Sequence, residues 1–458
     1  MPIPALLRPA RLRTRLWQAA GVLVLVLATV TVANFVIPRD RALTRDLIGH
    51  DFLAFYTAGT FARLGQFDSL YDLRAVHKFE RAAAEANALT IADDVAPFWN
   101  PPPVAWVFAP LSLLSYGAAL NVWLGINLVA LAGAIVMLIR MLPGERDWRA
   151  WALVPLLVCT SMPCIQAITH GQNTCVSLLM LCGVVTGWRR QRDALAGVLC
   201  GLMFYKPQLA AVLAVMLVLD RGPRALLGLG SALGALLLLT AFTMPGAIGD
   251  YARALPSNVR AIQIDQPYLW ERHVTLKAMW RLLVQGRAPG EASALVTVLT
   301  CLTSGAIGGG LVWAAWRARR AAAAAADDAF TGETKFLRRD RLIAATIAAA
   351  PLVMPFYFDY DLLLLAVPAV LFAGEMMTRV PGTTPRRSDD VVVFTWVALF
   401  GWTVINARVA GMTGLNVVAL VLCVLAALLI RIAAGEVQVA GSVIQRPQAQ
   451  PVVARRAA

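Results

Sequence analysis

The sequence predicts an all-α fold, a polytopic bundle of about 11–13 transmembrane spans when short and re-entrant helices are counted. Three observations lead to this prediction. Charged residues make up 15% of the chain and hydrophobic residues 59%, whereas a soluble domain carries about 25% charged residues. Basic residues cluster in alternate connecting segments, which is the pattern of cytoplasmic loops. Several apolar blocks reach the roughly 20 residues that a helix needs to cross the hydrocarbon core, among them Trp17–Ile37, Gly117–Ile139, Ala225–Met244 and Leu415–Ile430.

The net charge of +14, from 41 basic and 27 acidic residues, follows from this topology, so no nucleic-acid partner is predicted. Most Lys and Arg residues fall in seven segments that we assign to the cytoplasm, namely 1–16, 140–149, 188–193, 220–224, 317–341, 379–390 and 431–458. All seven cysteines lie in apolar segments, and none forms a C-x-x-C pair. Neither a disulfide framework nor a zinc site is therefore predicted.

A single membrane domain, residues 17–433, accounts for most of the chain. It follows a cytoplasmic N-terminus, 1–16, and begins with a retained span, because the first apolar run is longer than the roughly 7–15 residues of a signal-peptide core. Two extracytoplasmic loops, about 38–100 and 246–290, are long enough to enclose a site. The Gln-, Pro- and Ala-rich tail 434–458 is predicted to be cytoplasmic and disordered.

The first outer loop is predicted to hold two amphipathic helices on the membrane surface, Phe52–Leu64 and Leu70–Leu89. The run Pro101–Leu114 is too short to cross the membrane and reads as a half-span or re-entrant element, which needs surrounding protein or a water-filled cavity. Ala194–Asp220 is flanked by basic residues and predicts a hairpin of two short helices. Its tip is at Lys206-Pro207, because proline removes a backbone donor and breaks the helix.

The remaining apolar runs predict ordinary spans. Residues 150–168 and 174–188 form two of them, joined on the outer side by His170-Gly-Gln-Asn173. The charged segment 317–341 reads as a cytoplasmic linker. Further spans are predicted at 225–245, 291–316, 341–358, 362–378, 391–407 and 414–433.

Asp51 is the first candidate for chemistry, because it follows the first span and is surrounded by His50, Phe52, Phe55 and Tyr56. A carboxylate shielded by aromatic rings at the membrane surface can serve as a general base. Asp immediately before a helical run is also a favoured N-cap. The two roles are compatible.

The other candidates lie on the same side of the predicted topology, and each has a simpler alternative. Lys206 fits either a phosphate-binding point charge or a lysine that snorkels to the interface. His170 and Gln172 fit either a binding site or a polar turn. The group Arg272, His273 and Lys277 fits either an anion site or a solvated helix face.

Asp359 and Asp361 have the spacing of a D-x-D metal motif, but Asp at the end of a span is also an ordinary cap. Without a third ligand, no metal site is predicted. The sequence contains no P-loop, G-x-G-x-x-G, H-E-x-x-H or G-x-S-x-G motif, so nucleotide-driven chemistry is not supported.

Over roughly residues 20–375 the chain resembles glycosyltransferase family 87, the polyprenyl-phosphate-sugar-dependent mannosyltransferases of bacterial envelopes with a GT-C type membrane fold. Five features match in order. They are Asp51-Phe-Leu-Ala-Phe-Tyr56 with Gly65 and Leu70-Tyr71-Asp72; Asn100-Pro-Pro-Pro103 with Ala109-Pro110-Leu111; Gly171-Gln172-Asn173; Lys206-Pro207-Gln208; and Tyr360-Asp361-Leu362 with Pro355 before it. The 317–341 segment and the last two spans have no distinctive match.

The resemblance implies a membrane glycosyltransferase that moves a mannose-like hexose or a pentose from a polyprenyl-phosphate sugar to an envelope lipid or glycan. Asp51 matches the catalytic acidic residue and would act as general base with inversion, while Lys206 or Arg272 would stabilise the departing phosphate. Tyr56 offers a stacking surface for the sugar. The expected substrate-binding set is His50, Tyr56, Asn100, His170, Gln172, Lys206, Arg272, His273 and Asp361.

No cofactor or metal is expected, because the leaving group is already a phosphate anion. The resemblance also implies a multi-pass protein of the bacterial plasma (inner) membrane, with both termini cytoplasmic; its oligomeric state is not predicted. The main alternative is a transporter or lipid-linked glycan flippase, since interrupted helices line transport sites. Long outer loops and the lack of a convincing internal repeat favour the enzyme. A non-catalytic envelope-synthesis subunit is a third possibility.

Overall fold

The computed structural model describes residues 49–87, 96–144, 148–324, 331–378 and 387–435. Within these ranges the chain is helical between its connecting turns, and the only β-type pairing is an isolated antiparallel bridge between His273 and Phe358. The predicted all-α class is confirmed. The predicted N-terminus, the first span and nearly all of the predicted tail lie outside the described residues.

The elements run from the first outer loop to the last span, with η marking 3₁₀ helices. The first half contains α2 (Phe52–Leu64), η2 (Phe67–Tyr71), α3 (Leu73–Ala86), α4 (Pro103–Phe108), η3 (Leu111–Leu113), α5 (Tyr116–Met141), α6 (Trp148–Cys159), α7 (Met162–Thr169), α8 (Thr174–Arg189), α9 (Asp193–Leu202), η4 (Met203–Tyr205) and α10 (Pro207–Arg221). The second half contains α11 (Pro223–Thr243), α12 (Ala247–Gln263), η5 (Trp270–Arg272), α13 (Leu276–Gln285), α14 (Ala294–Ala324), α15 (Thr331–Val353), η6 (Asp359–Leu365), α16 (Ala366–Thr378), α17 (Arg387–Trp402), α18 (Asn406–Thr413) and α19 (Val417–Ala434).

Five of the described helices are long and apolar enough to cross a membrane, or up to seven if each of two bent pairs forms one span. This multi-pass architecture agrees with the predicted class, although fewer helices than the predicted 11–13 meet the full length and composition of a span. One bent pair is α6 with α7, at 60°, and the other is α17 with α18, at 79°. The predicted continuous spans 150–168 and 391–407 are therefore each interrupted.

α2 has the predicted bounds, but it is not a surface helix. Most of its residues between Phe52 and Ala62 are buried, and Phe55 stacks on Phe108 of α4 with ring centroids 4.7 Å apart. A methyl group on Gly59 would lie 2.5 Å from the Phe108 carbonyl, so the two helices touch backbone to backbone. The prediction of a surface position was wrong because the aromatic residues of α2 have a protein partner here and do not need the lipid interface.

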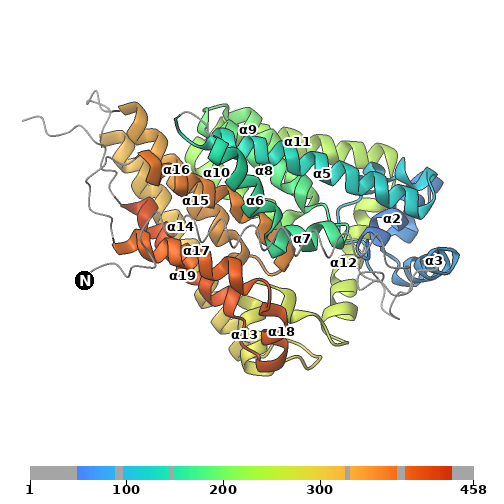
Figure 1. The fold of residues 1–458 in the computed structure, drawn as a ribbon. Helices are drawn as coiled ribbons and strands as arrows, with labels where there is room; N and C mark the ends of the chain where they lie inside the picture. The colour runs from blue at the N-terminus through green and yellow to red at the C-terminus, as the bar shows by residue number, and fades with distance from the viewer. Residues whose placement is uncertain (1–48, 88–95, 145–147, 325–330, 379–386, 436–458) are drawn as a thin grey trace, which may run out of the picture.

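α3 matches the prediction of an amphipathic helix. Val76, Glu80 and Ala84 are its buried residues, at the four-residue spacing of a single helical face. Its N-terminus is capped by Asp72, whose carboxylate accepts a hydrogen bond from the Arg74 backbone N–H. α2 and α3 lie together at one end of the molecule, with α14, α15 and α16 at the other (Figure 1).

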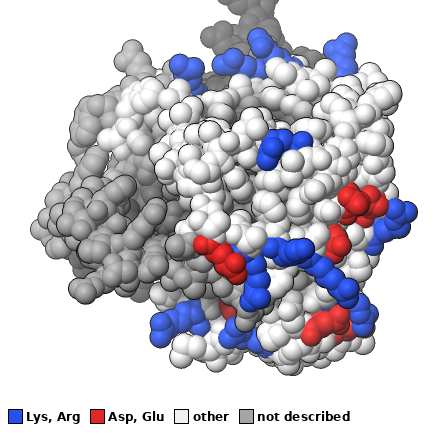
Figure 2. All heavy atoms as spheres, turned by 90° about the vertical axis from the view of Figure 1, so that its right-hand side faces the viewer, with Lys and Arg blue, Asp and Glu red and all other residues white. Residues whose placement is uncertain are grey.

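Figure 2 shows the end of the molecule that carries α2 and α3. Basic and acidic side chains lie next to one another across its lower half, while uncharged residues cover much of the upper half. The exposed pairs Arg253–Asp250 and Arg260–Glu291, at 2.7 and 3.0 Å, belong to the second outer loop. Basic and acidic side chains are therefore paired in this part of the surface.

The predicted hairpin at Lys206 is confirmed. Arg221 at the end of α10 forms an ion pair with Asp193 at the start of α9, at 2.7 Å, so the two helices fold back on each other. The run Pro101–Leu114, predicted to be too short to cross a membrane, forms the two short elements α4 and η3. The predicted linker 317–341 was wrong, because α14 continues to Ala324 and α15 begins at Thr331. Alanine and arginine are good helix formers, which explains the extension of α14.

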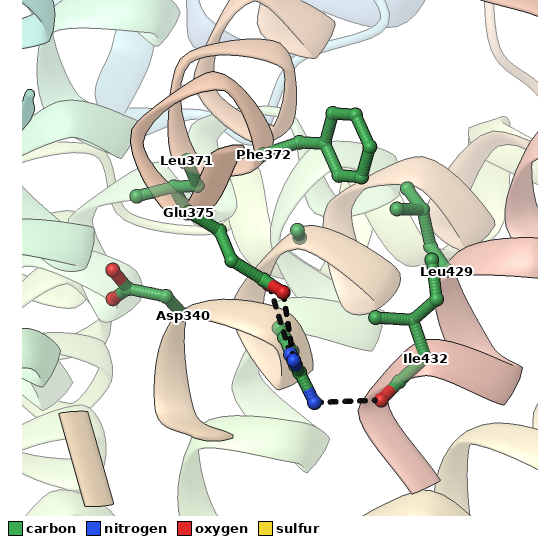
Figure 3. Close-up of a pocket in the computed structure, with 8 residues that line it drawn as sticks. Asp340, Leu371, Phe372, Glu375, Leu429 and Ile432 are labelled. Atoms are coloured by element: carbon green, nitrogen blue, oxygen red, sulfur yellow. Dashed lines mark hydrogen bonds and ion pairs between the residues drawn. The ribbon is translucent and has the colours of Figure 1, made fainter. Parts of the chain in front are cut away.

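A buried ion pair ties three helices together away from the first outer loop. The Arg341 guanidinium of α15 donates to both carboxylate oxygens of Glu375 of α16, at 2.9 and 2.7 Å, and to the Ile432 carbonyl of α19. Figure 3 shows these contacts beside a small cavity that Asp340, Leu371, Phe372 and Leu429 help to line. Glu375 lies near the C-terminal end of α16, so the helix separates this pair from Asp361, which precedes its N-terminus.

Candidate active site

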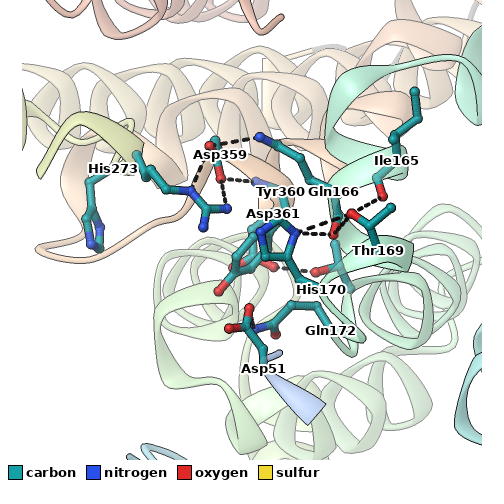
Figure 4. Close-up of polar contacts among 12 residues, drawn as sticks. Asp51, Ile165, Gln166, Thr169, His170, Gln172, His273, Asp359, Tyr360 and Asp361 are labelled. Atoms are coloured by element: carbon teal, nitrogen blue, oxygen red, sulfur yellow. Dashed lines mark hydrogen bonds and ion pairs between the residues drawn. The ribbon is translucent and has the colours of Figure 1, made fainter. Parts of the chain in front are cut away.

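Polar side chains from five separate segments meet at one end of the helices, on the side that the sequence predicts to be extracytoplasmic. They come from the start of α2, the α7–α8 turn, the tip of the α9–α10 hairpin, η5 and η6. Figure 4 shows Asp51, His170 and Gln172 grouped together beside Asp359 to Asp361, with His273 off to one side. These side chains form two networks of direct contacts. The first network contains Asp51, His50, Gln172, Lys206, Asp361 and Thr174. The second contains Arg272, Asp359 and Gln166.

The backbone around Asp51 is fixed by the α7–α8 turn. The Asp51 N–H donates to the His170 carbonyl at 3.1 Å, and the Gly49 N–H donates to the Thr169 carbonyl at 2.7 Å. The Tyr116 hydroxyl also donates to the Gly49 carbonyl, at 2.8 Å. Asp51 occupies the N-cap position of α2 but makes no capping hydrogen bond with its side chain. Its carboxylate is therefore turned toward the polar group instead of its own helix.

Gly171 makes the close approach of this turn possible. Its φ of 69° lies in the left-handed region that glycine tolerates and most residues do not. A methyl group here would lie 2.9 Å from Cβ of Phe52. The Gly171 carbonyl accepts a hydrogen bond from the Trp123 indole of α5 at 2.7 Å, which holds the turn against α5. Gln172 follows directly and projects toward Asp51.

The Asp51 carboxylate is accessible and held ionised. Its side chain is 28% exposed, its Oδ2 accepts a hydrogen bond from Gln172 Nε2 at 2.7 Å, and its Oδ1 lies 3.7 Å from His50 Nδ1. Burial by itself raises the pKa of Asp51, but the adjacent His50 imidazole, the nearby charge of His170, the Gln172 amide and the charge of Arg272 together hold it below its usual value. In turn, the adjacent Asp51 carboxylate raises the pKa of His50.

Lys206 is buried and already paired. Its Nζ lies 3.2 Å from Asp361 Oδ1 and 3.3 Å from Gln172 Oε1, and it sits 5.2 Å from the centre of the Tyr360 ring. The Thr174 hydroxyl donates to the same Asp361 oxygen at 2.8 Å. The side chain of Lys206 is 8% exposed and that of Asp361 1%. Lys206 is therefore not an interfacial snorkelling lysine.

Arg272 forms the second ion pair of the site. It donates to both oxygens of Asp359, at 3.3 and 3.0 Å, and Gln166 Nε2 donates to Asp359 Oδ2 at 3.1 Å. Its guanidinium lies 5.8 Å from the ring centres of both Phe358 and Tyr360. A guanidinium has five N–H donors, so Arg272 retains donors for a ligand while it remains paired.

Asn100 connects the first outer loop to the hairpin tip. Its backbone carbonyl accepts from the Tyr71 hydroxyl at 2.8 Å, and its side-chain amide donates to the Tyr205 carbonyl at 2.8 Å. Tyr205 immediately precedes Lys206, and its hydroxyl forms a short hydrogen bond with Ser177. Asn100 is itself buried. The structure therefore places it behind Lys206, where it positions the tip of the hairpin.

Two of the expected substrate-binding residues lie apart from this polar group. The Tyr56 hydroxyl donates to the Leu114 carbonyl at 2.9 Å, and its ring packs against Tyr116. His273 is completely buried; its Nδ1 accepts from the Tyr357 N–H, so Nε2 carries the proton that it shares with Tyr268. Burial, and then the charge of Arg272, lowers the pKa of His273 to about 3. A neutral, buried histidine fixes the loop and is not part of a solvated helix face.

His170 remains at the edge of the site. Its Nδ1 donates to the Gln166 carbonyl at 2.7 Å, and its ring centroid lies 6.3 Å from that of Tyr360. Lys277, in the first turn of α13, is partly buried, with Nζ 5.3 Å from the Trp270 ring centre and 4.9 Å from that of Phe356. It contacts no carboxylate among the described residues.

Sequence reasoning did not identify Thr174 or Gln166 as parts of the site, and it named Tyr360 only as part of a family motif. It read Asp359 as an ordinary cap or as part of a D-x-D motif without a predicted metal, whereas the carboxylate pairs with Arg272. The sequence does contain a signal for these ion pairs. Two acidic residues at the end of an apolar span need cationic partners when they are buried, so Asp359 and Asp361 predict nearby Lys or Arg side chains. Among the described residues, no three His, Cys, Asp or Glu side chains are grouped as metal ligands.

Comparison with known proteins assigns a family. The model of glycosyltransferase family 87 matches residues 98–332, slightly more than half of the chain. The matched region includes Asn100, Gln172, Lys206 and Arg272, but the segment with Asp51 and the segment with Asp361 lie outside it. No curated protein and no solved structure gives a significant match. The motifs predicted from the sequence and this match agree: the chain belongs to glycosyltransferase family 87 and is built as a multi-pass membrane protein.

Proposed function

We propose that this chain transfers a mannose-like hexose or a pentose from a polyprenyl-phosphate sugar to a lipid or glycan acceptor of the cell envelope. The reaction takes place on the extracytoplasmic face of a bacterial inner membrane, with both termini in the cytoplasm. The observation that carries the proposal is Asp51, an accessible carboxylate that accepts a hydrogen bond from Gln172 and makes no ion pair with Lys or Arg among the described residues. Family membership favours this enzyme over the transporter alternative.

Asp51 is suited to act as the general base. The carboxylate takes the proton of an acceptor hydroxyl as that oxygen forms a bond to the anomeric carbon. The bond from the anomeric carbon to the phosphate oxygen breaks, and polyprenyl phosphate leaves with the electron pair. Attack opposite to the leaving group inverts the anomeric centre. A base contributes about 10²- to 10⁴-fold to such a step.

The leaving phosphate requires cations that are not fully neutralised. Lys206 is buried and already occupied by Asp361 and Gln172, so it fits the expected phosphate contact poorly. Arg272 keeps free N–H donors, and Lys277 lies over aromatic rings without a carboxylate partner among the described residues. We therefore assign the phosphate to Arg272 and Lys277. Charge-assisted contacts of this kind stabilise developing negative charge in a partly desolvated site.

The test is Asp51→Asn, assayed for sugar transfer from a polyprenyl-phosphate hexose in proteoliposomes. We expect activity to fall by at least about a hundredfold, because the amide cannot accept the proton, while donor binding and the thermal unfolding temperature stay close to wild type. Asp250→Asn, at an exposed ion pair of the second outer loop, is the matched control and should remain active. Full activity of Asp51→Asn would refute the assignment of the base.

A further inference from the structure

We propose that Lys206 is a positioning residue that acts on Asp51 through the side-chain amide of Gln172. This inference rests on the proposed function, because it takes Asp51 to be the base. It gives Lys206 a different role from the phosphate contact that the sequence suggested. The chain of contacts runs from the buried pair Lys206–Asp361, through Gln172, to the accessible Asp51 carboxylate.

The amide of Gln172 has only one orientation that satisfies both neighbours. Its Oε1 accepts a hydrogen bond from Lys206 Nζ at 3.3 Å, and its Nε2 donates to Asp51 Oδ2 at 2.7 Å. Rotating the amide by half a turn would place its oxygen against the Asp51 carboxylate and its NH₂ group against the ammonium. Both contacts would be repulsive, so the positive charge of Lys206 fixes the direction of donation.

Lys206 is itself fixed from several sides. Asp361 Oδ1 accepts from it at 3.2 Å and also accepts from the Thr174 hydroxyl, which orients that carboxylate. The Tyr360 ring lies beneath the ammonium at 5.2 Å. The hairpin tip is held by the Asn100 amide, which donates to the Tyr205 carbonyl. A lysine restrained in this way is better placed to orient a neighbour than to follow a moving phosphate.

The proposed consequence is a precisely oriented base that stays ionised. Asp51 receives the Gln172 hydrogen bond on Oδ2, and His50 lies on the side of Oδ1. The other titratable or charged groups that face Asp51 are His170 from the α7–α8 turn, Arg272 from η5, Tyr116 from α5 and Tyr360 from η6. Loss of the Gln172 donor removes one of the influences that lower the pKa of Asp51. Its protonation would then shift toward higher pH.

The test measures kcat, donor KM and the pH dependence of kcat/KM for the full chain in proteoliposomes with a polyprenyl-phosphate hexose as donor. Lys206→Met alone leaves Asp361 buried without its cation and risks unfolding. The working variant is therefore Lys206→Met with Asp361→Asn, which removes both charges. The second variant, Gln172→Leu, removes the amide that connects Lys206 to Asp51. Thermal unfolding in detergent checks that both variants are folded.

Both variants should lower kcat by about tenfold to a hundredfold, the scale of a misplaced reacting group. Both should also move the acidic limb of the kcat/KM profile to higher pH and leave donor KM unchanged. When the two variants are combined, kcat should fall little further than in either variant alone, because both interrupt the same series of contacts. Lys277→Met should instead raise donor KM without moving the acidic limb.

A buried pair elsewhere supplies the matched control. Arg341→Met with Glu375→Gln removes a comparable ion pair near the C-terminal end of α16 and should leave the acidic limb in place. The inference is overturned if the Lys206 variant raises donor KM with the limb unmoved, or if its effect and that of Gln172→Leu are additive. If either of these results is obtained and Asp51→Asn is inactive, only the positioning role of Lys206 is rejected. If Asp51→Asn is active, the assignment of Asp51 as the base is rejected.

Discussion

Two buried ion pairs lie at opposite ends of α16, and they differ in what the cation contacts next. At the end near Glu375, Arg341 donates to both carboxylate oxygens and to the Ile432 carbonyl, so its contacts join α15, α16 and α19. At the other end, Lys206 divides its contacts between Asp361 and Gln172, and Gln172 reaches the exposed Asp51. The first pair holds helices together, whereas the second continues to an accessible carboxylate.

The difference shows why burial of a charge is not by itself a sign of function. Both pairs are nearly inaccessible, with side-chain exposures of 5% and 6% for Arg341 and Glu375 and of 8% and 1% for Lys206 and Asp361. An ion pair that joins neighbouring helices contributes to their packing and register. A pair with a hydrogen-bond route to solvent can transmit its orientation to a reacting group.

The strongest test of this comparison is Arg341→Met. Removing the guanidinium leaves the Glu375 carboxylate buried without its cation, which costs about 3–5 kcal/mol. We expect a large fall in the unfolding temperature measured in detergent, with the pH profile of the remaining folded enzyme unchanged. A shifted profile would show that this end of α16 also communicates with Asp51 and would break the comparison.

Gly171→Ala tests the Asp51 end with a smaller change. The substitution forces a left-handed residue to carry a Cβ that would lie 2.9 Å from Phe52, and such a conformation costs about 1–2 kcal/mol. We expect transfer activity to fall while the helices remain folded, because the turn also positions Gln172. Circular dichroism and kcat measured on the same preparation distinguish the two effects. Unchanged kcat would contradict tight positioning of the turn.

The smallest expected effect concerns Glu80, another buried acidic residue. Unlike Asp361 and Glu375, it forms no ion pair with Lys or Arg among the described residues. Its Oε2 accepts from the Ala96 N–H at 3.0 Å, and burial raises its pKa to about 7 from an ordinary 4.5. The folded state therefore holds this proton where the unfolded state has lost it, so stability falls as pH rises between about 4.5 and 7. Glu80→Gln should flatten this dependence in thermal unfolding between pH 5 and 8. An equally steep dependence in the variant would assign it to other groups.

Some elements were predictable because their signal is local. Pro207 marks the break of the hairpin, the face formed by Val76, Glu80 and Ala84 gives α3 its amphipathic pattern, and the apolar run Tyr116–Met141 is long enough to span. α2 was misassigned to the surface, because its aromatic residues fit a lipid interface as well as they fit Phe108. The helical ends of α14 and α15 were missed because charged alanine-rich segments suit linkers and helices alike.

The all-α membrane class, the family and most of the polar residues of the candidate site could be predicted from the amino-acid sequence alone. These follow from hydropathy, charge placement and short motifs, which act over a few residues. Which of these residues are in contact became evident only from the folded arrangement of the helices. It paired Lys206 with Asp361, 155 positions apart, and Arg272 with Asp359, and it turned the amide of Gln172 toward Asp51. The reason is physical: a buried charge must be neutralised by whatever partner the packing of distant helices brings within reach, and no local pattern specifies that partner.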